Sequence, residues 1–233
     1  MSNACWGVIP AAGSGSRMAA DRPKQYLEVA GRPLLEHSLG ALLSHPAISG
    51  VTVALQPDDP FAPEVPLLND PRVDRVAGAA ERSGSVLAAL AGLAERADPD
   101  DWVLVHDAAR PCLGAAELDR LLAAVLDAGC GGLLAQPVVD TLKRAGPGNR
   151  VASTVDRNEL WRAQTPQMFR LGELREALAA ALAAGVAVTD EASAMEWAGH
   201  PVQLVRGSPA NLKVTVAEDL ALAAWYLRER GAN

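Results

Sequence analysis

A glycine-rich loop near the N-terminus offers the first residues with a chemical use. Residues 10–18 read P-A-A-G-S-G-S-R-M and follow a short apolar run. Their small side chains let backbone N–H groups approach an anion closely. The loop lacks the Gly-Lys-Ser/Thr of a Walker A motif and the third glycine of GxGxxG. A tight strand-to-helix turn without a ligand therefore explains the same glycines equally well.

Two cations that accompany the loop favour phosphate binding. Arg17 closes the glycine run, and Lys24 stands in R-P-K-Q-Y. Attack at the α-phosphorus of a nucleoside triphosphate builds negative charge on the equatorial oxygens, and fixed cations stabilise that transition state. We therefore predict a triphosphate site here, with two solvated surface cations as the alternative.

A second candidate is the segment V-H-D-A-A-R-P, residues 105–111. Asp107 follows a buried apolar run, and ligands of open α/β sheets bind at the carboxyl edge of the strands. Its carboxylate is a candidate ligand for Mg²⁺ or for a ribose hydroxyl. Arg110 is a candidate partner for phosphate, or for Asp107 in a structural ion pair. His106 is predicted to be a packed core histidine, since no other histidine is spaced to join it in a metal site.

Three polar segments come later in the chain: D-R-N-E-L-W-R-A-Q-T (156–165), T-D-E (189–191) and N-L-K (211–213). Arg157 and Lys213 could bind a second anion, although each taken singly is better explained as an exposed cation. What these segments do depends on the elements that position them.

Short apolar runs alternate with longer amphipathic stretches, which is typical of βαβ units on a parallel sheet. Strands are expected at 4–9, 50–55, 73–76, 102–106, 132–138, 202–205 and 212–215, and helices at 34–43, 83–97, 115–128, 171–184, 191–198 and 217–230. Ser83 is the expected N-cap of its helix. The proline-rich segment 56–71 is expected to be a surface loop. The sequence thus predicts an α/β fold with a mostly parallel twisted sheet flanked by helices.

Residues 141–155, T-L-K-R-A-G-P-G-N-R-V-A-S-T-V, break this rhythm. Two β-type runs flank a Gly-Pro-Gly-Asn turn, and neither has an apolar face wide enough for a core. We predict a protruding β-arm at about 139–157 within a single domain that spans residues 1–233. Arms of this kind often add strands to a neighbouring subunit, so we expect a homodimer.

Composition narrows the partners and the compartment. The 233 residues can bury a sizeable core, and 49% hydrophobic and 21% charged residues are ordinary globular values. A net charge of -7 and a pI near 5.1 argue against nucleic acid and anionic membranes as partners, so any phosphate site must be local. Three cysteines are too few for a disulfide framework. A secretory signal begins with a basic segment, but no basic residue precedes Arg17. The longest apolar run, 177–188, is too short to cross a bilayer. We expect a cytoplasmic protein.

The motifs in order closely resemble the 2-C-methyl-D-erythritol 4-phosphate cytidylyltransferase family of the non-mevalonate isoprenoid pathway. They read A-A-G-S-G-S-R-M, R-P-K-Q-Y, H-D-A-A-R-P, D-T-L-K, D-R, Q-T-P-Q, T-D-E-A-S-A and N-L-K-V-T. The resemblance runs from Pro10 to about Leu222, nearly the full chain. It implies a Rossmann-like nucleotidyltransferase fold with a mixed sheet and an arm that interlocks two subunits. It also implies CTP, Mg²⁺ and 2-C-methyl-D-erythritol 4-phosphate as the molecules bound.

The resemblance also implies a role for each matching residue. Arg17 and Lys24 would be catalytic, holding the triphosphate and stabilising the pentacoordinate phosphorus. Arg157 and Lys213 would position the acceptor, with Thr141, Thr165, Thr189 and Asp190 nearby; Thr141 and Arg157, on or beside the arm, would serve the partner subunit's site. The nucleotide-binding residues would be Pro10, Ala11, Ala12, Gly13, Gly15, Gly78, Ala79, Ser85, Asp107, Ala108 and Arg110, with Asp107 also the candidate metal ligand.

One segment departs from the family pattern. The base-binding segment reads G-A-A-E-R-S-G-S-V (78–86), so Ala79 stands where the family usually has a second glycine, while Arg82 and Ser85 match. A methyl group at this position would narrow the pocket or demand a different φ.

The reaction implied is attack of an acceptor phosphate oxygen on the α-phosphorus of CTP, with pyrophosphate leaving and no covalent enzyme intermediate. The acceptor phosphate is already ionised near neutral pH, so no general base is needed. Two alternatives stay open: a cytidylyltransferase for another polyol phosphate such as ribitol 5-phosphate, and a nucleotide-binding regulatory module without turnover. A dehydrogenase is disfavoured, because the third loop glycine and an acidic ribose-binding residue at the expected offset are missing.

Overall fold

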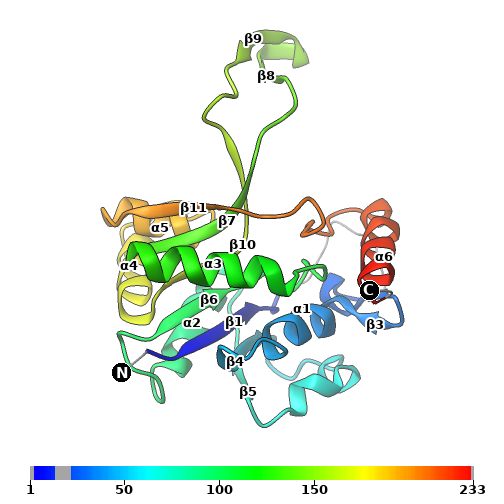
Figure 1. The fold of residues 1–233 in the computed structure, drawn as a ribbon, viewed down its shortest axis with the longest axis vertical. Coiled ribbons are helices and arrows are strands. Elements are labelled where there is room, and N and C mark those ends of the chain that lie inside the picture. The colour runs from blue at the N-terminus through cyan, green and yellow to red at the C-terminus, as the bar shows by residue number, and fades with distance from the viewer. Residues whose placement is uncertain (1–2, 14–21, 232–233) are drawn as a thin grey trace.

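A seven-stranded sheet forms the centre of the computed structural model, which describes residues 3–13 and 22–231. In spatial order the strands are β11 (Val202–Arg206), β7 (Gly131–Pro137), β10 (Trp161–Arg170), β6 (Trp102–Val105), β1 (Cys5–Pro10), β4 (Ile48–Leu55) and β5 (Val73–Ala77) (Figure 1). Strand β10 runs antiparallel to β6 and β7, and the other neighbouring pairs are parallel. The expected α/β fold with a mostly parallel sheet is confirmed.

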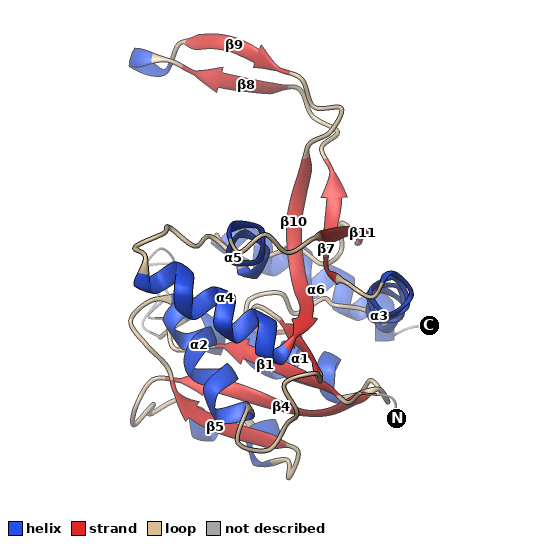
Figure 2. Ribbon diagram, turned by 90° about the vertical axis from the view of Figure 1, so that its left-hand side faces the viewer, coloured by secondary structure: helices blue, strands red, loops and turns tan. Residues whose placement is uncertain are grey.

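Helices cover both faces of the sheet (Figure 2). On one side lie α1 (Leu34–Leu43) and α3 (Ala115–Ala128), and on the other lie α2 (Arg82–Leu93), α4 (Leu171–Ala183) and α5 (Glu191–Trp197). The last helix, α6 (Ala217–Gly231), packs beside the short hairpin of β2 (Glu28–Val29) and β3 (Arg32–Pro33). Among the described residues, no helix combines the length and the apolar character needed to cross a membrane.

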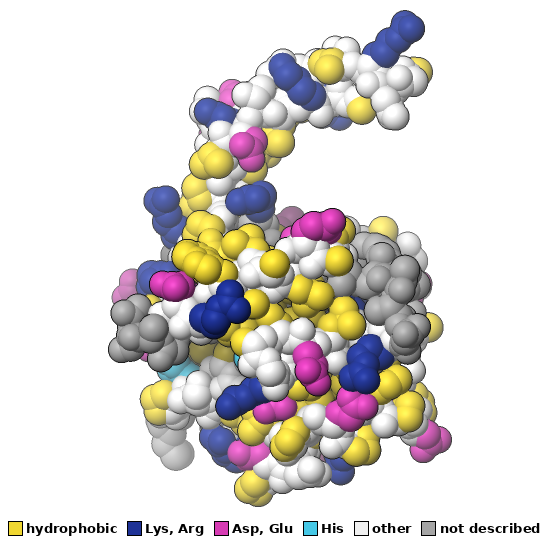
Figure 3. Space-filling model, turned by 90° about the vertical axis from the view of Figure 1, so that its right-hand side faces the viewer, with side chains coloured by type: hydrophobic (Ala, Val, Ile, Leu, Met, Phe, Trp, Pro, Cys, Tyr) yellow, Lys and Arg dark blue, Asp and Glu magenta, His cyan; other side chains and the backbone are white. Residues whose placement is uncertain are grey.

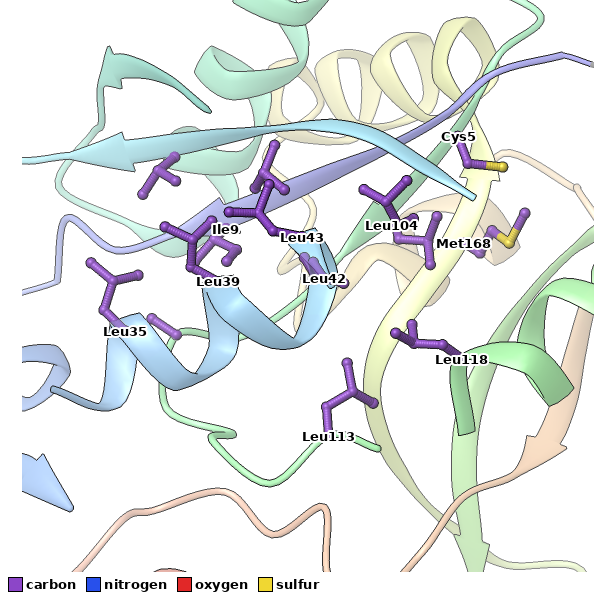
Figure 4. Close-up of a cluster of buried hydrophobic side chains, with 14 of the residues drawn as sticks. Cys5, Ile9, Leu35, Leu39, Leu42, Leu43, Leu104, Leu113, Leu118 and Met168 are labelled. Atoms are coloured by element: carbon purple, nitrogen blue, oxygen red, sulfur yellow. The ribbon is translucent and has the colours of Figure 1, made fainter. Parts of the chain in front are cut away.

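The central strands are apolar on both faces because their side chains alternate between two cores. Val8 and Val103 pack with α2 and α4, whereas their neighbours Ile9 and Leu104 pack with α1 and α3. Figure 4 shows Ile9 and Leu104 among leucines of α1 and α3. This double burial fixes the strands that carry the glycine loop and Asp107 at their carboxyl ends.

The predicted arm is present. Strands β8 (Leu142–Ala145) and β9 (Val151–Val155) pair antiparallel around the short 3-10 turn η5 (Pro147–Asn149), in which Gly148 has a φ of 68°. The hairpin stands well away from the body of the protein (Figures 1 and 2), and lysine and arginine side chains lie along it (Figure 3).

Two predictions of local structure are wrong. Helix α2 begins at Arg82 after Glu81, so Ser83 lies in the first turn instead of capping it, and the helix ends at Leu93. Residues 212–215 alternate like a strand but form none, because Val214 N bonds to Ala109 O in a loop. The surface segment 56–71 contains two 3-10 turns, η3 (Ala62–Glu64) and η4 (Pro66–Asn69).

Strand β10 was not predicted at all. Its residues 161–170 include Pro166 and several polar side chains, which made the segment resemble a connection. The pairing of β10 with β7 is interrupted between Ala163 and Gln167, and a proline inside a sheet is tolerated at such an irregularity.

Candidate active site

A cleft lies at the carboxyl ends of β1 and β6. Its first hollow, of about 390 Å³, is lined by residues 10–13, Lys24 of the 3-10 turn η2 (Lys24–Tyr26), Gln25, residues 79–82, Ser85, residues 107–109, Lys213 and Thr215. A second hollow of about 300 Å³ shares Arg82, Asp107 and Lys213 with the first. It is lined in addition by Arg110, residues 163–165, Gln167, Thr189 and Asp190. Three charged residues therefore stand at the junction of the two hollows.

The loop after β1 has its carbonyl oxygens occupied by glutamine side chains. Gln25 Nε2 donates to Ala11 O (2.7 Å) and Gly13 O (3.1 Å), and Gln56 Nε2 donates to Ala12 O (2.9 Å). Carbonyl oxygens repel anions, so pairing them with amide donors favours a phosphate beside this loop. Gln25 was not predicted, although it belongs to the R-P-K-Q-Y motif.

Most of the predicted phosphate-binding residues lie in the first hollow. Lys24 lines it together with Pro10, Ala11, Ala12 and Gly13. Arg17 and Gly15 lie outside the described residues. Their predicted roles stay predictions.

Residue 78 must be small because two loops meet there. Gly78 N donates to Leu55 O at 2.7 Å, and a Cβ on Gly78 would lie 2.4 Å from the Cβ of Ala12 and 3.0 Å from Ser85 Oγ. Ser85 Oγ in turn accepts from Ala79 N (3.0 Å) and lies 3.1 Å from Ala79 O. Gly78 and Ser85 thus shape the wall formed by residues 79–81.

Ala79, the departure from the family pattern, lies in that wall without backbone strain. It lines the first hollow, and the non-glycine residues with positive φ in the described chain are Ala30, Asp58 and Asn149. A Cβ on Gly84 would come within 2.8 Å of the Ala79 methyl group. Space for this methyl group therefore depends on the glycine at position 84.

Asp107 is buried among three cations at the junction. Its Oδ1 accepts from Arg82 Nε at 2.9 Å, and its Oδ2 lies 2.8 Å from Lys213 Nζ and 3.6 Å from Arg110 Nε. Burial by itself would raise the pKa of Asp107, but the charges of Arg82, Lys213 and Arg110 overcome it and hold that pKa well below its usual range. The carboxylate is therefore ionised at neutral pH.

The second partner of Arg82 is Glu191, the first residue of α5. Arg82 Nη1 donates to Glu191 Oε1 at 2.7 Å, and Nη2 donates to Oε2 at 3.0 Å. Burial would lower the pKa of Arg82, but Glu191 and Asp107 raise it above its usual range. Arg82 is thus a fixed cation between two carboxylates.

The donor set around Asp107 fits a metal that is bound together with phosphates. In the part of the chain that the structure describes, no group of three His, Cys, Asp or Glu side chains could hold a metal ion. Both oxygens of Asp107 also face cations. Magnesium in nucleotide sites is typically held by one or two carboxylates plus substrate phosphates. Asp107 can supply one such carboxylate, but the protein alone does not form a metal site there.

His106 holds the loop that carries Asp107. His106 Nε2 donates to the Arg110 carbonyl (3.1 Å), since a carbonyl can only accept. Thr165 Oγ1 lies 3.0 Å from His106 Nδ1. The same Oγ1 accepts from Asp107 N at 3.0 Å. Burial lowers the pKa of His106 to about 4. The ring is therefore neutral, as a packed core histidine should be, and the predicted residue Thr165 lies behind Asp107.

The N-L-K segment is fastened to β10, and this places Lys213. Asn211 Nδ2 donates to Thr165 O at 2.8 Å, and Arg110 Nη1 donates to Asn211 O at 2.8 Å. Arg110 therefore serves three structural contacts, with Asp107 and with the carbonyls of Asn211 and Ala163. Ala108 lines the first hollow beside them.

Thr189 and Asp190 lie at the edge of the second hollow. Asp190 caps α5, because its Oδ1 accepts from Ser193 N at 3.0 Å. Its Oδ2 accepts from Gln167 Nε2 at 2.9 Å, which joins the cap to β10. Thr189 is exposed.

The structure does not bring two predicted residues to the cleft. Thr141 and Arg157 are exposed at the base of the arm and line neither hollow. The Arg157 guanidinium contacts the carbonyl of Val139. Within one chain, these two residues and the cleft are separate.

Comparison with known proteins places these features in one family. The model of the family described as 2-C-methyl-D-erythritol 4-phosphate cytidylyltransferase matches residues 5–229. The chain is 58% identical to the Pseudomonas fluorescens protein of that name, and the alignment covers 99% of this chain and 97% of the relative. It is 57% identical to the Ectopseudomonas mendocina protein of that name, over 99% of each chain.

Solved structures agree with the sequence comparisons. A crystal structure of 4-diphosphocytidyl-2C-methyl-D-erythritol synthase is 40% identical, with a TM-score of 0.84 over 97% of this chain and all of that one. The Francisella tularensis 2-C-methyl-D-erythritol 4-phosphate cytidylyltransferase is 35% identical, with a TM-score of 0.81 over 96% of this chain and 99% of that one.

Proposed function

The chain belongs to the 2-C-methyl-D-erythritol 4-phosphate cytidylyltransferase family, and from this premise we propose how its cleft works. The enzyme transfers CMP from CTP to 2-C-methyl-D-erythritol 4-phosphate, in isoprenoid biosynthesis. The products are 4-diphosphocytidyl-2-C-methyl-D-erythritol and pyrophosphate. The observation that carries the site assignment is that segments far apart in the sequence line two hollows joined at Asp107, Arg82 and Lys213.

We assign the nucleotide to the first hollow and the acceptor to the second. Lys24 and the glutamine-braced loop of residues 10–13 would hold the triphosphate, a role that the family resemblance also assigns to Arg17. Residues 78–85 would face the base, and Asp107 would accept from a ribose hydroxyl or bind the metal. Lys213, which lines both hollows, would hold the acceptor phosphate against the α-phosphorus. Thr165, Thr189 and Asp190 would complete the acceptor side.

The chemistry requires positioning and charge stabilisation. An acceptor phosphate oxygen forms a bond to the α-phosphorus of CTP, and the bond from that phosphorus to the bridging oxygen of pyrophosphate breaks. The attacking phosphate is already ionised near neutral pH, so the protein need not remove a proton. Lys24 and Lys213 then neutralise charge on the phosphoryl oxygens and align the reactants.

Magnesium is the proposed metal. It would be held by the triphosphate oxygens and by Asp107, once Lys213 leaves Oδ2 for the acceptor phosphate. Bound there, it would supply positive charge to the phosphoryl group.

The arm suggests a homodimer whose subunits complete one another's sites. Thr141 and Arg157 line neither hollow of their own chain, yet the family resemblance assigns them to the acceptor. We propose that each arm brings them to the partner's second hollow. Mixing Lys24→Ala and Arg157→Ala proteins tests this: exchange of subunits would restore up to about a quarter of native activity through one intact site per mixed dimer. No recovery after verified exchange would contradict the proposal.

The compartment and the domain organisation complete the proposal. Cys5, Cys112 and Cys130 are all free thiols, which agrees with a reducing cytoplasm. We take residues 1–233 as one catalytic domain whose arm serves the dimer.

Acceptor specificity is the decisive test of the function. Pyrophosphate release is measured with CTP, Mg²⁺ and either 2-C-methyl-D-erythritol 4-phosphate or ribitol 5-phosphate. We expect turnover with the first acceptor to exceed that with the second by at least about 10²-fold, the discrimination expected of buried polar groups. A chain that binds CTP but releases pyrophosphate with neither acceptor would instead be a nucleotide-binding module.

A further inference from the structure

Glu191 is a buried carboxylate that does not line the cleft. It is 1% exposed, it begins α5, and its carboxylate pairs with Arg82 through both oxygens, at 2.7 and 3.0 Å. The Nε–H of the same guanidinium donates to Asp107 Oδ1 at 2.9 Å. One guanidinium thus links a carboxylate behind the cleft to a carboxylate inside it.

The planar guanidinium makes this link directional. Its donors lie in one plane at fixed angles, so two bonds to Glu191 fix the direction in which Nε points. A lysine in place of Arg82 would keep the charge but could not hold both carboxylates in this arrangement. The position of Glu191 therefore determines where Asp107 Oδ1 is held.

The two oxygens of Asp107 differ in how firmly they are held. Oδ1 is bound by Arg82, which Glu191 anchors, whereas Oδ2 pairs at 2.8 Å with Lys213, whose side chain is 41% exposed, and has only a longer contact of 3.6 Å with Arg110. Exposed ion pairs are weak and readily exchanged, while a buried carboxylate bound through both oxygens is not. Asp107 therefore has one fixed oxygen and one that a ligand can take over.

We propose that Glu191 is a positioning residue for CMP transfer, acting through Arg82 to fix the Asp107 carboxylate so that its Oδ2 faces the substrates. This rests on the function proposed above. It assigns Arg82 to this link and not to direct phosphate binding, although Arg82 lines both hollows. A purely structural Glu191 would instead stabilise the start of α5 and the packing around it, independently of Asp107.

A double-mutant cycle separates the two roles. Glu191→Gln, Asp107→Asn and the double variant are compared in kcat/KM for CTP, with acceptor and Mg²⁺ saturating. Because coupled residues show non-additive effects, we expect Glu191→Gln to lower kcat/KM about tenfold or more in the native background but at most about twofold when Asp107 is already Asn. Equal losses in the two backgrounds would overturn the proposal.

Two further variants control for folding and charge. Asp101 is also a buried carboxylate, 8% exposed, which accepts from Ala4 N and Trp6 Nε1 at the opposite end of the strands. Asp101→Asn should lower the melting temperature but leave kcat/KM per folded molecule unchanged. Arg82→Lys keeps the cation and removes the planar link, so we expect a loss of kcat/KM matching that of Glu191→Gln. Native kcat/KM in Arg82→Lys would contradict the positioning role.

The same cycle is measured on CTP affinity by calorimetry, which needs no turnover. Failure of the native chain to turn over any acceptor would refute the proposed function, while the coupling between Glu191 and Asp107 in CTP affinity would still decide the positioning role. We expect Glu191→Gln to weaken CTP binding only where Asp107 is present.

Discussion

Because His106 is buried behind the cleft, we expect the free energy of unfolding to fall in weak acid. Burial lowers its pKa from 6.5 to about 4, so between these values the unfolded chain binds a proton that the native ring does not. A group of this kind contributes its full stability above pH 6.5 and loses it as the pH falls toward 4. At 1.36 kcal/mol per pH unit, the loss amounts to about 3 kcal/mol across the interval. The ring is fully buried, so solvent does not screen the effect.

The assay is urea unfolding of the native chain and of His106→Gln between pH 4 and 7.5. Glutamine does not titrate, and its amide can still donate toward the Arg110 carbonyl that His106 Nε2 contacts. The variant should be less stable at pH 7.5, yet its free energy of unfolding should fall about 3 kcal/mol less between pH 6.5 and 4 than that of the native chain. If the unfolding free energies of the two proteins fall in parallel between pH 6.5 and 4, the His106 ring does not bind its proton only on unfolding.

The remaining predictions concern the phosphate loop, its glycine and the metal. Lys24→Ala should lower kcat by about 10²-fold or more with a smaller change in CTP affinity, measured by pyrophosphate release, because Lys24 is proposed to stabilise the transition state. Gly78→Ala should lower the free energy of unfolding in urea by about 1–3 kcal/mol and weaken CTP binding, because its Cβ would lie 2.4 Å from the Cβ of Ala12. Gly40→Ala in α1 is the control: the nearest contact of its Cβ would be at 3.4 Å, so the free energy of unfolding should stay equal or rise by up to about 1 kcal/mol. Chelation of divalent cations should abolish turnover and lower CTP affinity, and Mg²⁺ should restore both; full CTP affinity without metal would contradict this account.

Elements with strong local signals were predictable. The leucine spacing of residues 34–43 gave the bounds of α1, and the predicted helix 115–128 agrees with α3, which ends before Gly129, whose φ is 65°. Strand β10 was not predictable in this way, because its polar residues are satisfied by distant partners. Thr165 bonds to His106, and Gln167 bonds to Asp190. Local pattern alone makes such a segment resemble a surface loop.

The same limit applied inside the site. The apolar run before Asp107 placed this residue at a strand end correctly, and Arg110 was predicted to pair either with phosphate or with Asp107. In the structure the closer partners of Asp107 are Arg82 and Lys213, which come from other elements. In the sequence Glu191 is only one letter of T-D-E, and its pairing with Arg82 became visible only in the structure, where the first residues of α2 and α5 meet.

The charges of the cleft explain why the nucleotide should arrive with its metal. Among the described residues, four cations line the cleft, Lys24, Arg82, Arg110 and Lys213, together with three carboxylates, Glu81, Asp107 and Asp190. Glu191, behind the cleft, pairs with Arg82, so these eight groups together contribute no net charge, and the whole chain carries -7. A triphosphate with several negative charges needs compensation from outside this balance. Backbone amides and Arg17 would supply part of it, and the proposed divalent cation, bound to the phosphates, would supply the rest without requiring Asp107 to leave Arg82. Affinity for CTP should accordingly depend on Mg²⁺ more steeply than on any single one of the four cations.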